Sequence, residues 1–411
     1  MDIKCIRCKG TDPQNNCGRA FCPIVAKAES MFKVREKLPG ENFSGSAPTP
    51  FVGRFGYPFV NVGILSTSDI VQDAWRYDAP KFWSGQNYDI PSVIDLRSSL
   101  INSRFKAQIK DAGRMLGITQ EVGIAAKPVD IEVELNKKPV FRLSNEASIA
   151  PTGPTASLKH IAITSNPKVD QKVDKVVSDT DLKARDAMVY LYEHEFDENT
   201  LSRILSVGVL GLKYSRKLVP TRWSITATDD MLAKHILDEI RDYAQADYLA
   251  YFGSYLGNYY LIMLFPEIWS YELFEMYLPR ASWNITEKVQ YTTDWEPYEG
   301  RKTYAENCAG GYYSVRLAVL EQLRKIKRQA SVVVVRFITG EYAVPLGVWV
   351  TREAARKALT NKPIEFASKE LMLKYAQALI KKKFSYDINN ALGNSILLKN
   401  MKQQKKLFEF A

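Results

Sequence analysis

The sequence predicts an α+β or mixed α/β body, with a small four-cysteine module at its N-terminus and a flexible tail at its C-terminus. Runs with helical spacing alternate along the chain with short β-prone runs, and the clearest pair of β-prone runs predicts an antiparallel hairpin. Such a mixture favours an α+β or mixed α/β body over a helix bundle. The two ends differ from this body, since four of the five cysteines lie before residue 23 and lysines gather at the other end.

The overall composition is that of an ordinary globular protein. The 411 residues are 46% hydrophobic and 25% charged, which excludes wholesale disorder and collagen-like repeats. No apolar run approaches the ~18 residues needed to span a bilayer, and the N-terminus lacks the apolar stretch of a signal peptide. We therefore expect a soluble, cytoplasmic protein with no membrane partner.

The formal net charge of +10 is concentrated at the two ends. Residues 1–37 carry eight Lys or Arg and four acidic residues, and residues 381–411 carry seven Lys and two acidic residues. The chain between them is nearly balanced, with 41 basic and 40 acidic residues. A basic end raises the local concentration near a phosphate backbone, although lysine-rich ends are more often simply solvated. The balanced body suits a defined pocket better than a broad electrostatic groove.

The N-terminal cysteines have the spacing of a metal site. Cys5, Cys8, Cys17 and Cys22 form the pattern C-x2-C-x8-C-x4-C. The first pair can face one metal ion from a tight turn, and four thiolates in a tetrahedral array suit Zn²⁺. An iron–sulfur cluster also takes four cysteines and stays open as an alternative, whereas disulfides are disfavoured in an intracellular chain. We expect residues 1–30 to form a structural zinc-binding module.

The first half of the body is predicted to contain several short elements. Residues 39–63 indicate turns and short strands, and apolar spacing predicts one helix over 93–116. The alternation VDIEVEL predicts a half-exposed strand over 129–135. A Pro- and Gly-rich segment over 144–157 is the best internal boundary. We therefore expect the body to consist of an N-terminal α/β region over 31–150 and a C-terminal α+β region over 151–384.

The second half of the body holds the strongest patterns. A capping-box-like start at Thr226-x-x-Asp229 predicts a helix over 228–246. Two β-prone runs flank Gly257-Asn258 and predict a hairpin, with a third strand over 269–277. The other elements expected here are strands over 160–163 and 331–338, and helices over 181–192, 201–205, 312–327, 351–359 and 368–381.

Two groups of residues are candidates for chemistry. Arg222 precedes the adjacent acids Asp229 and Asp230, which at a helix start could bind Mg²⁺ or, as we prefer, favour the positive end of the helix dipole. Cys308 leads through two glycines, Gly310 and Gly311, into another helix, where exposed N–H groups would form an anion site.

The same helix start would lower the pKa of the Cys308 thiol and make it a candidate nucleophile, although a small buried cysteine in a tight turn is the preferred interpretation. Glu299 and Arg301 lie just upstream as candidate ligand-binding residues. If both groups shared one pocket, the protein would be a nucleotide-binding or nucleotide-hydrolysing enzyme. The catalytic residues are unknown, because the common hydrolase, NTPase and Rossmann motifs are absent.

The end of the chain carries a short motif, Q-x-x-L-x-x-F, formed by Gln404, Leu407 and Phe410. In a 3₁₀ turn residues three apart lie on one side, so Leu407 and Phe410, with Phe408 beside them, would form a small apolar plug. The alternative is an amphipathic helix packed on the body. The motif resembles the PCNA-interacting peptide, which docks proteins onto the DNA sliding clamp. Residues 386–401 have few pattern signals, so we expect a basic, partly flexible tail over 385–411.

The whole chain resembles the archaeal Nre family of DNA repair proteins. The resemblance implies a DNA repair factor that reaches DNA through PCNA and so is associated with the nucleoid. It implies no active site that can be placed on these residues. The residues that carry it are the cysteine set ending in Cys22-Pro23-Ile24, the stretches PTRWSITATDD (220–230), RDYAQADY (241–248), CAGGYYSVRLAVLE (308–321), RQASVVVVR (328–336) and PLGVWV (345–350), and the tail motif.

Overall fold

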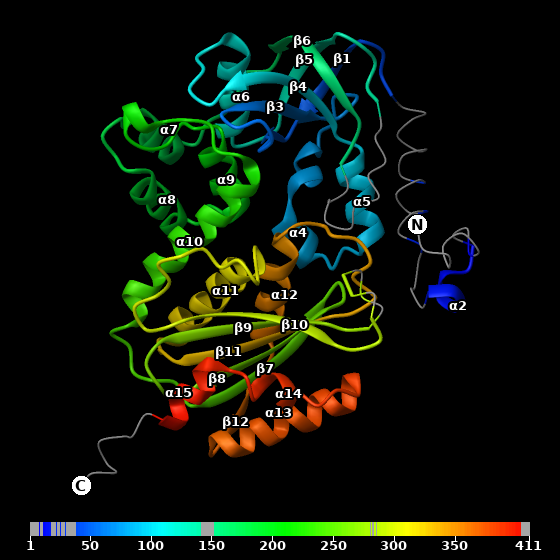
Figure 1. Cartoon of the computed structure of the whole chain (residues 1–411). Coiled ribbons are helices and arrows are strands. Elements are labelled where there is room, and N and C mark those ends of the chain that lie inside the picture. Colours follow the sequence, from blue (N-terminus) through cyan, green and yellow to red (C-terminus); the bar gives the residue numbers. More distant parts are fainter. Residues whose placement is uncertain are drawn as a thin grey trace. The chain divides into compact units, whose positions relative to one another are not determined.

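The computed structural model describes residues 8, 11–17, 22, 25, 29, 38–140, 152–279, 281, 283–284 and 286–403. These residues form two compact units, each with one six-stranded sheet (Figure 1). The N-terminal unit holds the described residues from 22 to 232 and also Val344–Gly347. The C-terminal unit holds the described residues of 233–343 and 348–403, together with the described residues up to 17. The mixture of helices and sheets predicted for the body is confirmed.

The N-terminal unit is built on a sheet with strand order β1-β5-β6-β4-β3-β2. Only the β4–β6 pair is parallel among the described strands of this sheet. The strands are β1 (Asn42–Ala47), β2 (Thr49–Val52), β3 (Phe59–Ser66), β4 (Ile101–Gln108), β5 (Val129–Leu135) and β6 (Thr155–Ile163). The other elements of this unit are η1 (Ala74–Asp78), α4 (Pro80–Gly85), α5 (Ile90–Ser98), α6 (Arg114–Ile124), α7 (Gln171–Ser178), α8 (Ala184–Glu193), α9 (Glu198–Ser206) and η2 (Lys213–Ser215). The short helix α2 (Pro13–Cys17) belongs to the C-terminal unit.

Helix α6 covers one face of this sheet. Its Ile118 and Val122 pack on inward-facing residues of the strands, such as Ile64, Ile131 and Ile161. Strand β5 has the bounds that the VDIEVEL alternation predicts, and its burial alternates along all seven residues. The alternation follows from the two-residue period of a strand, which sends every second side chain into the core.

The single helix predicted over 93–116 is wrong. The structure divides this stretch into the end of α5, all of β4 and the start of α6. Helix α5 starts where the side chain of Asp89 accepts a hydrogen bond from the N–H of Ser92. Strand β4 then pairs with β3 over eight residues and with β6 over three. Its apolar residues fit a helical period and a strand period about equally well over so short a run, and the neighbouring strands decide between them.

The C-terminal unit is built on a sheet with strand order β10-β9-β11-β8-β7-β12, in which β9 and β11 are parallel. The strands are β7 (Tyr248–Tyr255), β8 (Asn258–Phe265), β9 (Ser270–Tyr277), β10 (Gln290–Glu296), β11 (Ser331–Ile338) and β12 (Ile364–Phe366). The helices are α11 (Gly311–Ile326), α12 (Trp349–Thr360), α13 (Lys369–Phe384), α14 (Asn389–Leu392) and α15 (Ile396–Gln403).

The predicted hairpin is present as β7 and β8, one residue out of register with the expected turn. Leu256 and Gly257 both have positive φ, at 48° and 72°, as a two-residue type I′ turn requires. The turn therefore precedes Asn258, which is the first residue of β8. The predicted third strand is β9, and β11 has the predicted bounds.

Helix α10 (Thr221–Ile240) connects the two units and differs from the predicted helix at both ends. It starts seven residues earlier, because the carbonyl of Pro220 accepts hydrogen bonds from the N–H groups of Trp223 and Ser224. It ends at Ile240, after which the chain forms a bridge to Gln329. The adjacent acids Asp229 and Asp230 consequently lie in the interior of α10 and not at its start, so the helix-dipole interpretation of these acids is wrong.

The stretch over 386–401, predicted as partly flexible, forms α14 and α15 and packs on the body. Ile388, Ala391, Leu397 and Leu398 are buried in the core that α13 forms with one face of the second sheet. Helices α11 and α12 lie on the other face (Figure 1). Across the described residues, none of the helices is both long and apolar enough to serve as a membrane span.

Candidate functional site

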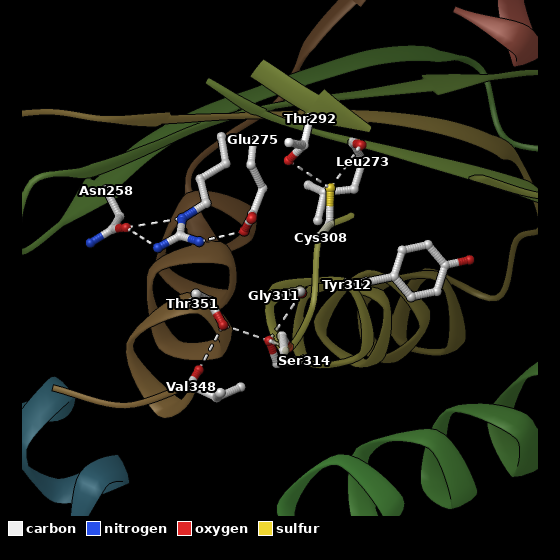
Figure 2. Close-up of polar contacts among 12 residues, drawn as sticks. Asn258, Leu273, Glu275, Thr292, Cys308, Gly311, Tyr312, Ser314, Val348 and Thr351 are labelled. Carbon is white, nitrogen blue, oxygen red and sulfur yellow. Dashed lines mark hydrogen bonds and ion pairs between the residues drawn. The ribbon is translucent and has the colours of Figure 1, made fainter. Parts of the chain in front are cut away.

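The second sheet carries a buried polar cluster on the face that α11 and α12 cover. On β11, Val335 and Phe337 point into the apolar core of the opposite face, so Arg336 between them points toward α11. We call this cluster the α11 cluster and define it as Asn258, Tyr260, Glu275, Cys308, Gly311 and Arg336. Most of these residues lie on β8, β9 and β11, and Cys308 and Gly311 lie at the entry to α11. Figure 2 labels four of them, Asn258, Glu275, Cys308 and Gly311.

Arg336 is the centre of the α11 cluster. Its Nε and Nη2 donate to Oδ1 of Asn258 at 3.0 and 2.6 Å, and its Nη1 donates to Oε1 of Glu275 (Figure 2). The other carboxylate oxygen of Glu275 accepts a hydrogen bond from the hydroxyl of Tyr277 at 3.2 Å. Arg336 and Glu275 are 6% and 5% exposed. A buried pair with this many hydrogen bonds compensates its desolvation, and removal of either partner leaves a buried charge alone.

The two glycines at the start of α11 allow the helix to begin against this ion pair. A Cβ atom on Gly311 would lie 2.2 Å from Oε1 of Glu275, and Gly310 has a φ of +89°. The carboxylate of Glu275 therefore lies where the sequence predicts an anion, next to the positive end of the helix dipole. The first turn is held further by Ser314, whose hydroxyl bonds to the carbonyls of Gly310 and Gly311 and to the hydroxyl of Thr351.

Cys308 is fully buried beside the same carboxylate. Its Sγ lies 3.5 Å from Oγ1 of Thr292 and 3.8 Å from the carbonyl oxygen of Leu273 (Figure 2). Its N–H donates to Oδ2 of Asp294 at 2.8 Å. Burial, and then the charge of Glu275, raise the pKa of the Cys308 thiol. The lowered pKa expected for a thiol at a helix start is therefore wrong here, since burial outweighs the dipole.

Arg301 is one of the predicted ligand-binding residues, and its guanidinium holds a loop of the protein itself. Nη1 bonds to Oδ1 of Asp294 at 2.9 Å and to the carbonyl of Trp295 at 3.0 Å. Nε and Nη2 bond to the carbonyls of Thr303 and Tyr304. Glu299 is exposed in the turn after β10.

A second buried ion pair joins α11 to β10, and sequence reasoning missed it. Nε of Arg316 lies 2.9 Å from Oε1 of Glu296, and both side chains are almost fully buried. Glu296 also accepts hydrogen bonds from Nε1 of Trp269 at 3.0 Å and from the hydroxyl of Tyr312 at 2.8 Å. A charged residue inside an apolar run, such as Arg336 in SVVVVRFI, indicates a buried charge that needs a partner. The partner, however, comes from another strand and has no sequence signal.

The remaining predicted ligand residues belong to the N-terminal unit. On α10, Arg222 is exposed, Asp229 is buried and Asp230 is half-buried. The predicted pocket would join these residues to Gly310 and Gly311 of the other unit, and it stays a prediction. Thermal stabilisation by an adenine nucleotide would support it by mass action on the folded state.

The two predicted sites at the ends of the chain lie largely outside the described residues. Among the four cysteines, Cys8 is buried and Cys22 is half-buried, while Cys5 and the side chain of Cys17 are not described. The tail residues Gln404, Leu407, Phe408 and Phe410 also lie outside the described residues, since these end at Gln403.

Comparison with known proteins gives consistent matches along the chain. The family "Archaeal Nre, N-terminal" matches residues 16–284, and "Archaeal Nre, C-terminal" matches residues 296–410. The chain is 37% identical to DNA repair protein NreB of Archaeoglobus fulgidus, over 99% of this chain and 100% of the relative. It is 38% identical to NreA of the same organism, over 90% and 91%, and 36% identical to NreA of Haloferax volcanii, over 80% and 81%. No solved structure matches the chain significantly.

Proposed function

Because this chain belongs to the archaeal Nre family, whose matched relatives are DNA repair proteins, we propose that it is a DNA repair factor recruited to DNA by the PCNA sliding clamp. The similarity to DNA repair proteins over at least 80% of the chain carries the repair role. The tail motif Q-x-x-L-x-x-F supports recruitment by the clamp, and short motifs of this kind bind through a few anchor side chains.

The attachment of α15 to the body supports a docking role for the residues after it. Glu272 of β9 accepts hydrogen bonds from the N–H groups of Ile396 and Leu397, each at 3.1 Å, and from the hydroxyl of Ser395. Helix α15 ends at Gln403, so the motif follows directly after a helix that is fixed to the sheet.

The clamp proposal is tested by measuring binding of the full chain to PCNA with Phe410→Ala, Leu407→Ala and Glu409→Ala variants. We expect the first two substitutions to weaken binding at least about tenfold, because each removes an anchor side chain of the motif. Glu409 is not an anchor in Q-x-x-L-x-x-F, so Glu409→Ala should bind as the wild type does. Equal binding of wild type and Phe410→Ala would refute the proposal.

We further propose that Cys5, Cys8, Cys17 and Cys22 hold one structural Zn²⁺ ion. The support is the four-thiolate pattern and its two-residue first spacing. Elemental analysis of the purified protein should find one zinc per chain, and Cys8→Ser should lower this content. Stoichiometric iron in the purified protein would favour the iron–sulfur alternative. Absence of both zinc and iron would exclude both kinds of metal site.

A further inference from the structure

The β2–β3 hairpin of the N-terminal unit exposes a group of large aromatic side chains. Each of these side chains is at least 36% exposed, and contiguous exposed apolar surface marks an interaction site. We call this group the aromatic hairpin and define it as Phe51, Phe55, Tyr57 and Phe59, which are 36%, 77%, 41% and 62% exposed, together with Trp223 of α10, which is 45% exposed.

The aromatic hairpin is a built feature and not a loose loop. The carbonyl of Pro58 accepts a hydrogen bond from the N–H of Ile109 at 3.1 Å, which holds the hairpin to the end of β4. The N–H of Val52 donates to Oγ1 of Thr221 at 2.9 Å, which holds it to the start of α10. These contacts place the ring centroids of Tyr57 and Trp223 5.3 Å apart.

The exposure of these rings is not required by the core. On the same two strands, Val52, Val60 and Val62 are at most 1% exposed and fill the interior beneath α6. Small aliphatic residues thus fill the core, and the large aromatic residues occupy the outward positions of the same strands. The hairpin is held in place by hydrogen bonds while its rings face solvent. Such a surface is preorganised for binding.

The charges around the aromatic hairpin are complementary to phosphate. Arg54 lies at the hairpin tip, with its guanidinium 5.0 Å from the centre of the Phe55 ring. Lys106 of β4 is exposed beside its register partner Asn61, and Lys110 and Arg222 are also exposed at this end. Residues 49–66, 101–110 and 216–228, which form this surface, contain no Asp or Glu, and the acids that follow them directly are the exposed Asp111 and the buried Asp229.

We propose that the aromatic hairpin binds single-stranded DNA by stacking unpaired bases on its rings while the surrounding Arg and Lys contact the phosphates. Aromatic rings interleaved with basic residues are the common design of sequence-independent single-strand binding. In a duplex the base faces stack on one another and are hidden, so exposed rings favour unpaired bases. This inference rests on the proposed repair function and names the form of DNA that the N-terminal unit contacts.

The test measures binding of the full chain to a fluorescent single-stranded oligonucleotide of about 20 nucleotides, to the duplex of the same sequence and to the RNA of the same sequence. The variant Phe55→Ala/Phe59→Ala should bind single-stranded DNA at least about tenfold more weakly than the wild type. The matched control is Ile70→Ala, because Ile70 lies in the same unit and is 60% exposed, close to the 62% of Phe59. This control should bind as the wild type does.

Two further variants separate stacking from other causes. Phe55→Tyr/Phe59→Tyr keeps the rings and should retain binding, whereas Phe55→Leu/Phe59→Leu keeps apolar surface and should lose it. Lys106→Ala should lower the slope of log affinity against log salt concentration by about one. Circular dichroism melts confirm that each variant is folded. Equal affinity of wild type and Phe55→Ala/Phe59→Ala, equal affinity for duplex, or tighter binding of the RNA would each overturn the proposal.

The clamp assay distinguishes failure of this inference from failure of the proposed function. Phe55→Ala/Phe59→Ala should bind PCNA normally, and Phe410→Ala should bind single-stranded DNA normally, since the two surfaces belong to different segments. Loss of DNA binding in the first variant alone supports the aromatic hairpin even if the tail proves not to bind the clamp.

Discussion

The absence of a side chain at Gly311 lets α11 begin against the buried pair of Glu275 and Arg336. The Oε1 atom of Glu275 occupies the position at which a Cβ would stand, and Nη1 of Arg336 lies 3.5 Å from the same position. Neither charged group can move aside without breaking its hydrogen bonds, since Arg336 is also held by Asn258. The conformation of one backbone position and the integrity of an ion pair are therefore coupled.

We expect Gly311→Ala to lower the free energy of unfolding by about 1–3 kcal/mol, the usual effect of forcing a methyl group into a filled site. Urea unfolding followed by circular dichroism measures the change. The matched control is Gly117→Ala in α6, where a Cβ would meet nothing within 4 Å. Because alanine favours a helix over glycine, the control should be neutral or gain up to about 1 kcal/mol. A Gly311→Ala protein as stable as the wild type would contradict this account of the helix start.

Helix α15 depends on one carboxylate from a strand more than 100 residues away in sequence. Glu272 is fully buried and accepts hydrogen bonds from the first turn of α15. The hydroxyl of Ser395 donates to Glu272 and accepts a hydrogen bond from the N–H of Leu398 at 3.0 Å. The negative charge also lies at the positive end of the helix dipole. The last described helix is thus held to the sheet by Glu272 of β9 in addition to the apolar contacts of Leu397 and Leu398.

Glu272→Ala should release α15 from the sheet while the rest of the C-terminal unit stays folded. The substitution leaves the buried N–H of Leu397 and the partly buried N–H of Ile396 without an acceptor, and a buried N–H without a partner costs about 1–3 kcal/mol. Hydrogen exchange followed by mass spectrometry should therefore show faster exchange in residues 389–403. Glu365→Ala is the matched control, because Glu365 lies on the edge strand β12 of the same sheet and is exposed. Unchanged exchange in α15 would show that its apolar contacts alone hold it.

The C-terminal unit as a body buries several acidic hydroxyl and thiol groups. Burial is the main reason why the pKa values of four groups are raised, those of Tyr260, Tyr271, Tyr312 and Cys308. Each group therefore holds its proton more firmly in the folded chain than in the unfolded chain. In the unfolded chain the thiol has a pKa near 9.0 and the tyrosines have a pKa near 10.0. Below these values both states of the chain keep the protons, and the folded state has its full stability. As the pH rises above them the unfolded chain loses protons that the folded chain keeps, so the free energy of unfolding falls.

We expect the free energy of unfolding to fall steeply above about pH 9, by at most about 1.4 kcal/mol per pH unit for each of these groups. Urea unfolding at a series of pH values from 7 to 11 measures the slope. Tyr260→Phe supplies the control, since the Tyr260 hydroxyl is fully buried and has no hydrogen-bond partner among the residues that the structure describes. This variant should show a shallower alkaline loss and no loss at pH 7. A stability that is flat to pH 11 would contradict the prediction.

Local patterns were sufficient for much of the fold. The bounds of β5 and β11 and the presence of the β7–β8 hairpin follow from alternation and turn residues, which act within a few positions of the chain. The Nre resemblance, which also came from stretches of sequence alone, is confirmed by the family matches. The predicted metal site at the N-terminus and the clamp motif at the C-terminus stay predictions, because they fall largely outside the described residues.

Contacts between residues distant in sequence decided the remaining elements and the buried ion pairs. A periodic pattern indicates which side of an element is apolar, but it does not indicate what packs against that side. The apolar residues of 93–116 became strand β4 since β3 and β6 are available to pair with them. Arg336 meets Glu275 only because β9 and β11 are neighbours in register. Likewise, the aromatic residues of the β2–β3 hairpin could not be distinguished from core residues by sequence. The tertiary structure buries the valines of the same strands, and the aromatic rings therefore face outward.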